Sequence, residues 1–131
     1  WMLGDSFSTV GWPHCGEIDI MEQTGWDKET TLGTLHWWNT AGSNNASYGT
    51  TTTVANSTSE FHIYSLEWTP SFIKIYVDDQ LYHTVANSPA IPFNQDFYII
   101  LNVAMGGTFG GPVDPAFNNS TMEIDLVKRV L

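Results

Sequence analysis

Three carboxylates stand close together in the segment Glu17–Glu22, at positions 17, 19 and 22. The alternation of acidic and apolar residues predicts a β-strand with Glu17 and Asp19 on one face and the two isoleucines on the other. Strict alternation would send Glu22 into the apolar core, where an unpaired carboxylate costs several kcal/mol. We therefore expect a β-bulge near Met21, which returns Glu22 to the face of the other two acids.

Two carboxyl groups on one face can hydrolyse a glycosidic bond. With the bulge absorbed, Glu17 and Glu22 are roughly four strand steps apart, or about 13 Å at Cα. Side chains that lean toward each other above Asp19 would bring the carboxyls within the ~5–5.5 Å that retaining glycosidases need. Asp19 would raise the proton affinity of a neighbour, or orient the nucleophile through a shared proton. The pattern predicts a retaining glycosidase centre.

Two other interpretations of the acids stay open at this point. Three acids on one strand can simply form its solvated face. The same carboxylates can also bind Ca²⁺ or Mg²⁺, which prefer oxygen ligands, although three acids on one strand converge poorly around an ion.

The composition excludes several classes of partner. Four Lys and Arg residues against 14 Asp and Glu give a net charge of −10, which repels nucleic acid and anionic membrane surfaces. No apolar stretch approaches the ~18 residues that a membrane-spanning helix needs. Six Trp, five Tyr and seven Phe favour recognition through flat apolar faces, such as the C–H faces of sugar rings. A neutral, hydroxyl-rich ligand fits this composition best.

The chain as a whole predicts an all-β fold. Short runs of β-branched and aromatic residues alternate with turn-rich segments, and no window of about 11 residues shows a helical stripe. Residues 39–59 are almost wholly polar and are expected to form a long surface loop. A glycine-rich loop is expected at Gly106–Pro112. The expected strands, whose spacing suits an antiparallel β-sandwich, are Glu17–Glu22, Thr31–Trp38, Phe61–Thr69, Phe72–Val77, Gln80–Val85, Phe97–Ala104 and Met122–Val130.

The length of 131 residues predicts one domain over residues 1–131, with a sizeable core and no room for a second domain. Cys15 is the single cysteine, so no intrachain disulfide can form. We expect it to be a small buried thiol and not a nucleophile.

The segment Trp12–Glu22 resembles the catalytic segment of glycoside hydrolase family 16, most closely its laminarinase branch. The resemblance spans essentially the whole chain, and it implies a concanavalin-like β-jelly roll with a concave cleft. It also implies hydrolysis of internal β-1,3 bonds of glucans such as laminarin by double displacement. The further blocks that follow the family's order are Trp1–Gly4, Glu67–Pro70, Ile75–Asp78, Leu101–Gly107 and Met122–Asp125.

The resemblance assigns a role to five of these residues. Glu17 would be the nucleophile and Glu22 the general acid/base, while Asp19 would hold and tune Glu17. Trp12 matches a tryptophan that lines the glycone side of the cleft, with a core tryptophan as the alternative. His36 matches a histidine that reaches toward the acid/base, with a structural histidine as the alternative.

Four further residues complete the candidates. Asn102 is a weaker sugar-binding candidate, because alternation places it opposite its apolar neighbours. Asp125 resembles a ligand for a structural calcium ion on the convex side, with a strand-end acid as the alternative. Catalysis itself is expected to need no cofactor. Trp37 and Trp38 are consecutive, so they are expected to point to opposite faces and at most one should contact substrate.

The family's catalytic domain usually has further strands before the block that begins here at Trp1. We therefore expect a C-terminal portion of a longer domain, lacking N-terminal strands and prone to self-association through exposed edges. A polymeric substrate implies action outside the cell. The rival functions are a β-glucan recognition module on the same fold, and a family member that acts on mixed-linkage glucan or agar.

Overall fold

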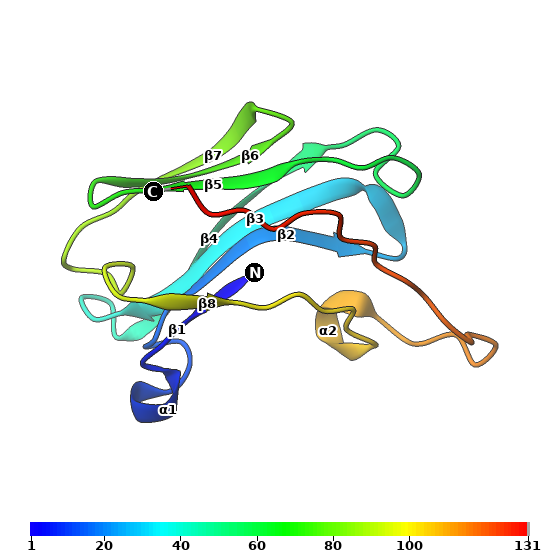
Figure 1. Cartoon of the computed structure of the whole chain (residues 1–131). Coiled ribbons are helices and arrows are strands. Elements are labelled where there is room, and N and C mark those ends of the chain that lie inside the picture. The colour runs from blue at the N-terminus through cyan, green and yellow to red at the C-terminus, as the bar shows by residue number, and fades with distance from the viewer. Residues whose placement is uncertain (131) are drawn as a thin grey trace. The chain divides into compact units, whose positions relative to one another are not determined.

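The computed structural model describes residues 1–130 and contains two compact units, Trp1–Ile100 and Leu101–Leu131. The first unit is an antiparallel β-sandwich (Figure 1), which confirms the predicted fold class. One sheet has the strand order β4-β3-β2-β1-β8, and the other has the order β5-β6-β7. The strands are β1 Met2–Gly4, β2 Glu17–Thr24, β3 Asp27–Asn39, β4 Asn44–Thr53, β5 Tyr64–Trp68, β6 Phe72–Val77, β7 Gln80–Ala86 and β8 Phe97–Ile99. A single helical turn, α1 Phe7–Val10, follows β1.

The core lies between the two sheets of the first unit. The strand β6 shows this most clearly, because partly and fully buried residues alternate along its whole length. Phe93 joins the core from the segment between β7 and β8. Ile18 and Leu35 come from the first sheet, and Ile73, Ile75 and Val85 come from the second.

Residues 44–53 form the strand β4, so the prediction of a loop over 39–59 was wrong for this part. β4 pairs with β3 in unbroken register, from Thr30 opposite Thr53 to Asn39 opposite Asn44. β4 is the outermost strand of its sheet, and most of its side chains are exposed. Its polarity therefore reflects exposure, while its β-branched threonines favour the extended backbone.

The predicted strand Phe97–Ala104 is shortened to Phe97–Ile99. The predicted strand Met122–Val130 is absent from the described residues. β8 ends at Ile99 because its partner β1 has three residues, all of which are already paired. Residues 122–130 have no strand partner among the described residues, and an alternating sequence forms a strand only where a neighbour accepts its hydrogen bonds.

The second unit consists mainly of exposed, irregular chain. It contains one helical turn, α2 Gly107–Gly110, inside the predicted glycine-rich loop. A turn follows in which the Phe117 amide donates to the Asp114 carbonyl at 2.9 Å. The expectation of one domain over residues 1–131 stays a prediction.

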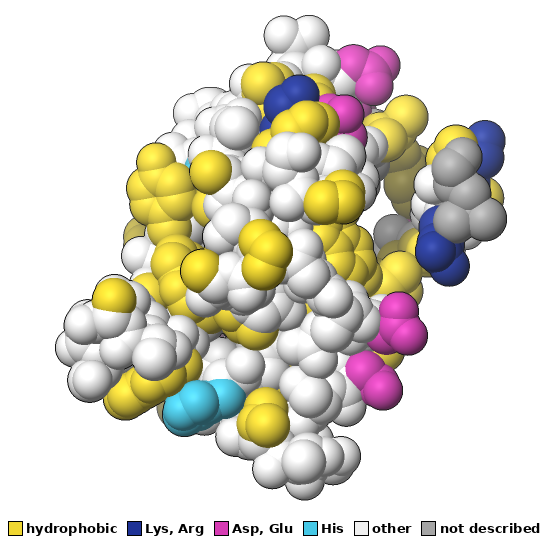
Figure 2. Space-filling model, turned by 90° about the vertical axis from the view of Figure 1, so that its left-hand side faces the viewer, with side chains coloured by type: hydrophobic (Ala, Val, Ile, Leu, Met, Phe, Trp, Pro, Cys, Tyr) yellow, Lys and Arg dark blue, Asp and Glu magenta, His cyan; other side chains and the backbone are white. Residues whose placement is uncertain are grey.

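The surface is rich in apolar side chains. Figure 2 shows them interspersed with polar ones over one face, with few charged groups among them. Trp26 is 72% exposed and Leu126 is also 72% exposed. Among residues 1–130, none of the helices has the length and apolar character required to traverse a lipid bilayer.

Candidate active site

The three acids of β2 share one face because the strand contains a bulge. Asp19 lies opposite Thr34 and Glu22 opposite Leu32, so β2 takes three steps where β3 takes two. One extra residue therefore sits between Asp19 and Glu22, which confirms the predicted bulge. Thr34 and Leu32 share a face of β3, and directly opposed residues lie on the same side of a sheet. Glu17, two residues before Asp19, completes the row.

The acids are not a solvated face. Asp19 is only 2% exposed, and Glu17 and Glu22 are partly buried. Water-facing acids on a strand need no such burial, and burying them costs free energy. The alternative of a solvated face is therefore wrong for Asp19, which is in contact with His36. Paired, half-buried carboxylates are typical of sites where proton affinity matters.

Trp12 binds the candidate nucleophile directly. Its indole N–H donates to Oε2 of Glu17 at 2.7 Å. The side chain is 47% exposed, so the alternative of a core tryptophan is wrong. An exposed indole beside a carboxylate offers a flat apolar surface next to the reacting group.

Gly16 lets the chain turn from the Trp12 loop into β2. Its φ is 77°, in the left-handed region that favours glycine. A Cβ at this position would lie 3.1–3.2 Å from Phe97, Pro92 and Phe93. The start of β2 therefore packs closely against the segment before β8 and against Phe97.

His36 lies opposite Glu17 on β3 and contacts Asp19. Its Nε2 is 3.2 Å from Oδ2 of Asp19, which is close enough for an ion pair. The angles of this contact do not meet those of a hydrogen bond. Asp19 raises the pKa of His36 above its ordinary value, and the charges of Glu17 and Glu22 act in the same direction. The resemblance implied a histidine that reaches toward Glu22, whereas the contact here is with the central acid.

Burial raises the pKa of both outer acids. The pKa of Glu17 rises to about 7, because of burial first and the neighbouring Asp19 second. The pKa of Glu22 is raised by the same two causes in the same order. The charge of His36 opposes the rise at both residues, and the Trp12 N–H also favours the ionised form of Glu17. A carboxyl that keeps its proton into the neutral range can act as a general acid.

The arrangement gives little support to a hard cation at the three acids. Among the described residues, the group whose ligand atoms all lie within 4.8 Å of one another is Glu17, Asp19 and His36. It includes an imidazole nitrogen and leaves out Glu22, while Ca²⁺ and Mg²⁺ take oxygen ligands. Asp125 belongs to no such group among residues 1–130.

The first unit thus brings together five of the seven predicted site residues: Trp12, Glu17, Asp19, Glu22 and His36. Asn102 and Asp125 belong to the second unit, where both are exposed and outside regular strands. Their roles stay predictions.

The structure also adds a pair that the sequence did not single out. The rings of His14 and Trp38 stack, with centroids 4.9 Å apart and an interplanar angle of 18°. Trp37 points the other way and packs edge-on against Phe93 in the core, which confirms that the two tryptophans diverge. The signal available in the sequence was that Trp38 shares its strand face with His36.

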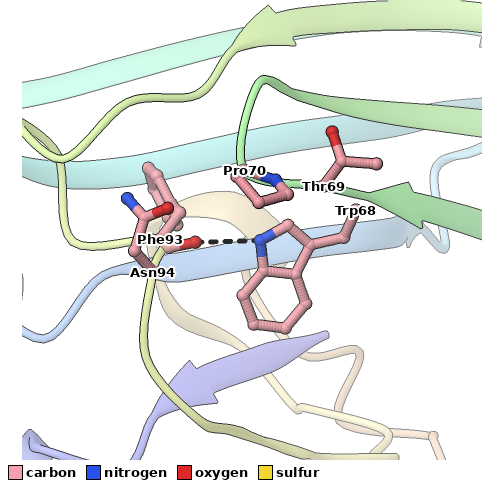
Figure 3. Close-up of a pocket in the computed structure, with 5 residues that line it drawn as sticks. All are labelled: Trp68, Thr69, Pro70, Phe93 and Asn94. Carbon is pink, nitrogen blue, oxygen red and sulfur yellow. Dashed lines mark hydrogen bonds between the residues drawn. The ribbon is translucent and has the colours of Figure 1, made fainter. Parts of the chain in front are cut away.

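One surface hollow of the first unit is lined by no acidic residue. It has a volume of about 390 Å³ and is lined by Trp68, Thr69, Pro70, Phe93 and Asn94 (Figure 3). The indole N–H of Trp68 points at the Phe93 carbonyl and donates to it at 2.9 Å. This contact ties the second sheet to the segment before β8, so a structural role accounts for the tryptophan.

The known proteins that are similar to this chain agree with the glycosidase interpretation of the geometry. Residues 2–128 match the family described as Glycosyl hydrolases family 16. A Glucan endo-1,3-beta-glucosidase from Cryptopygus antarcticus is 36% identical over 98% of this chain and 54% of its own length. A Beta-1,3-glucan-binding protein from Penaeus monodon is 36% identical over 84% of this chain and 38% of its own length. The chain spans about half the length of the curated relatives it matches first.

A solved structure gives the same architecture. The crystal structure of LamAcat from Zobellia galactanivorans superposes with a TM-score of 0.83 at 41% identity, over 89% of this chain and 51% of that one. A LamA variant from the same organism is solved in complex with laminaritriose and laminaritetraose.

Proposed function

The chain belongs to glycosyl hydrolases family 16, and on that basis we propose that it hydrolyses internal β-1,3 bonds of β-glucans with retention of configuration. The observation that carries this proposal is the bulge between Asp19 and Glu22, which places two half-buried carboxyls on one face of β2. A nucleophile and a general acid/base are the two groups that retaining hydrolysis requires.

The reaction uses Glu17 and Glu22 in two steps. Ionised Glu17 attacks the anomeric carbon, and the bond to the leaving oxygen breaks as Glu22 gives that oxygen its proton. The product is a glycosyl ester on Glu17 and a free sugar chain. Glu22, now ionised, takes a proton from water, and the resulting hydroxide displaces Glu17 and restores both groups.

The surrounding residues set the protonation that these steps need. Burial raises the pKa of Glu22 and keeps its proton available for the leaving oxygen. Glu17 must be ionised to attack, and the Trp12 N–H and the charge of His36 both favour that form. Asp19 holds His36 in place and couples its charge to both glutamates.

The relatives and the position of Trp12 support the choice of substrate. A relative named as an endo-1,3-beta-glucosidase and a LamA complex with laminaritriose and laminaritetraose support a β-1,3-glucan. The exposed indole beside Glu17 offers a stacking surface for one sugar ring. The proposal includes action outside the cell on a polymer, no cofactor in catalysis, substrate contact by Asn102 and a structural calcium ion at Asp125.

Laminarin hydrolysis by wild type, Glu17→Gln and Glu22→Gln tests the assignment. Each variant should lose at least 100-fold in kcat, because each removes one of the two essential groups. Proton NMR of the first product should show the β-anomer from the wild type. A first product in the α configuration, or reducing-sugar release by Glu17→Gln equal to wild type, contradicts the proposal.

The same assay separates the rival functions. A β-glucan recognition module, as the name of the Penaeus monodon relative suggests for that protein, would bind laminarin without releasing reducing ends. A hydrolase for another polysaccharide would act faster on mixed-linkage glucan or agar than on laminarin. Both glutamates are in place here, which favours hydrolysis over binding alone.

A further inference from the structure

A second hollow lies beyond Glu17, on the side away from Glu22. It has a volume of about 260 Å³ and is lined by His14, Trp38, Thr40 and residues 89–92. The stacked rings of His14 and Trp38 form one wall. Neither ring contributes to the chemistry described above, so the pair needs another explanation.

The strand register places this hollow on the face of the acids. Trp38 is two residues after His36 on β3, and His36 lies opposite Glu17. Residues two apart share a face and are separated by about 7 Å along a strand. His14 is two residues after Trp12, which binds Glu17. Both walls therefore continue segments that position the nucleophile.

The walls of the hollow are ordered before any ligand arrives. The side-chain amide of Gln95 donates to the carbonyls of Cys15, at 2.8 Å, and of Pro92, at 3.0 Å. The amide of Asn94 donates to the carbonyl of Ser88 at 2.7 Å. These bonds hold the segment before β8 in shape and fasten it to the loop that carries His14. A preformed site loses little conformational entropy on binding.

The direction of the sugar chain decides what the hollow can hold. In retaining hydrolysis, the two carboxyls act from opposite sides of the sugar whose bond is cleaved. The line from Glu22 to Glu17 therefore crosses the glucan main chain, and that line follows β2. The main chain must then run across the strands. A hollow that extends the same line past Glu17 lies beside the main chain, where a substituent of the chain can enter it.

We infer that the hollow between His14 and Trp38 binds a single glucosyl branch attached at O6 of the β-1,3-glucan main chain. The exocyclic O6 projects sideways from a glucosyl ring and is free in a β-1,3-linked chain. The indole and imidazole surfaces match the C–H face of a sugar ring, and the Thr40 hydroxyl and imidazole nitrogens match its hydroxyls. The volume is small for a ligand site and suits one ring. This inference rests on the proposed function.

Two synthetic substrates test it: laminarihexaose, which is linear, and the same main chain carrying one β-1,6-linked glucosyl branch. The variants are His14→Ala and Trp38→Ala in the full chain. Each should lower the ratio of kcat/KM for the branched over the linear substrate about fivefold to tenfold, because one stacking contact is lost. The side chain of His14 is exposed and lies outside the strands, so its replacement spares β3. The matched control is Trp26→Ala, at the turn between β2 and β3, which should leave the ratio unchanged.

The outcomes separate this inference from the proposed function. A wild type that cleaves both substrates, with variants that keep the wild-type ratio, overturns the branch site alone. Equal losses on both substrates also overturn it, because they assign the hollow to the main chain. A wild type that cleaves neither substrate overturns the proposed function, and the branch site falls with it.

Discussion

The proposed reaction begins with Glu17 ionised and Glu22 protonated, although burial raises the pKa of both. Residues near them separate the two roles. Trp12 donates a hydrogen bond to Glu17, which favours the ionised nucleophile. At Glu22, burial and the charge of Asp19 raise the pKa and favour the protonated form.

His36 controls both glutamates through its charge. Its positive form lowers the pKa of Glu17 and of Glu22, because it stabilises their carboxylates. In His36→Gln both values therefore rise, and both limbs of the pH profile of kcat/KM on laminarin should move to higher pH. His62→Gln is the control, since His62 pairs with Asp78 in another part of the fold. Limbs that stay in place or move to lower pH would contradict this role for His36.

The ionised form of Glu17 is expected to lower the free energy of unfolding. Its pKa is about 7 in the folded chain against an ordinary value of 4.5, so the folded state binds the proton more tightly than the unfolded state. The charge therefore destabilises the fold as pH rises from 4.5 through 7. Glu17→Gln should raise the free energy of unfolding by about 1–2 kcal/mol at about pH 8, a reduced figure because water screens the exposed half of the side chain.

Urea unfolding of both proteins at two pH values checks this prediction. The gain should disappear near pH 4, where Glu17 is protonated in the folded and the unfolded chain alike. An equal gain at both pH values would assign the stabilisation to packing and not to charge.

At the scale of elements, the bulge decides on which face of β2 the side chain of Glu22 lies. Tyr82 of β7 donates to the carbonyl of Ile20, beside the bulge, at 3.3 Å. Gly33 lies on β3 opposite the bulged residues, and a Cβ there would come within 2.5 Å of the Tyr82 hydroxyl. Tyr82 of the second sheet therefore reaches β2 past position 33, where a side chain larger than that of glycine would obstruct it.

Exchanging Met21 and Glu22 tests the bulge. Because Glu22 lies opposite Leu32, a carboxyl moved to position 21 leaves the row of acids. The double variant Met21→Glu, Glu22→Met should lose about 100-fold or more in kcat, the contribution of a general acid/base. Deleting Met21 removes the extra residue, and simple alternation then keeps Glu22 on the acid face. That deletion should lose much less activity, and the opposite ranking would disprove the bulge.

At the scale of the whole molecule, the sandwich depends on close approach of its sheets. Gly33→Ala should destabilise the fold by about 1–3 kcal/mol, since the new methyl meets Tyr82 and, at 2.9 Å, Ile75. Gly25→Ala is the matched control, because nothing lies within 4 Å of its Cβ, and it should change stability by less than about 0.5 kcal/mol. Thermal unfolding of the two variants compares them directly, and equal stabilities would refute the close contact.

The exposed apolar surface predicts self-association. Ile99 on the outermost strand β8 is 51% exposed, and Leu126 and Val130 in the second unit are 72% and 79% exposed. Large apolar side chains and open strand edges both favour contact with a second copy. Light scattering over a range of concentrations should show the mean mass rising, and a constant monomer mass would refute this expectation.

The fold was predictable where one face of a strand is apolar. Phe72–Val77 begins and ends as predicted, and Gln80–Val85 gains one residue, because alternate burial leaves a direct trace in the sequence. β4 and the missing strand at 122–130 were not predictable in this way. A polar edge strand has no buried face to reveal it, and an alternating segment needs a partner strand that its own residues do not specify.

The amino-acid sequence alone determined the row of acids on β2, because alternation and the cost of burying Glu22 leave one arrangement with a bulge near Met21. Only the tertiary structure decided that Asp19 is buried against His36 and that His14 stacks on Trp38. The spacing of residues along one strand determines only which of its side chains share a face. Contacts between segments far apart in the chain depend on how strands pair and loops pack, and no single stretch of sequence contains that information.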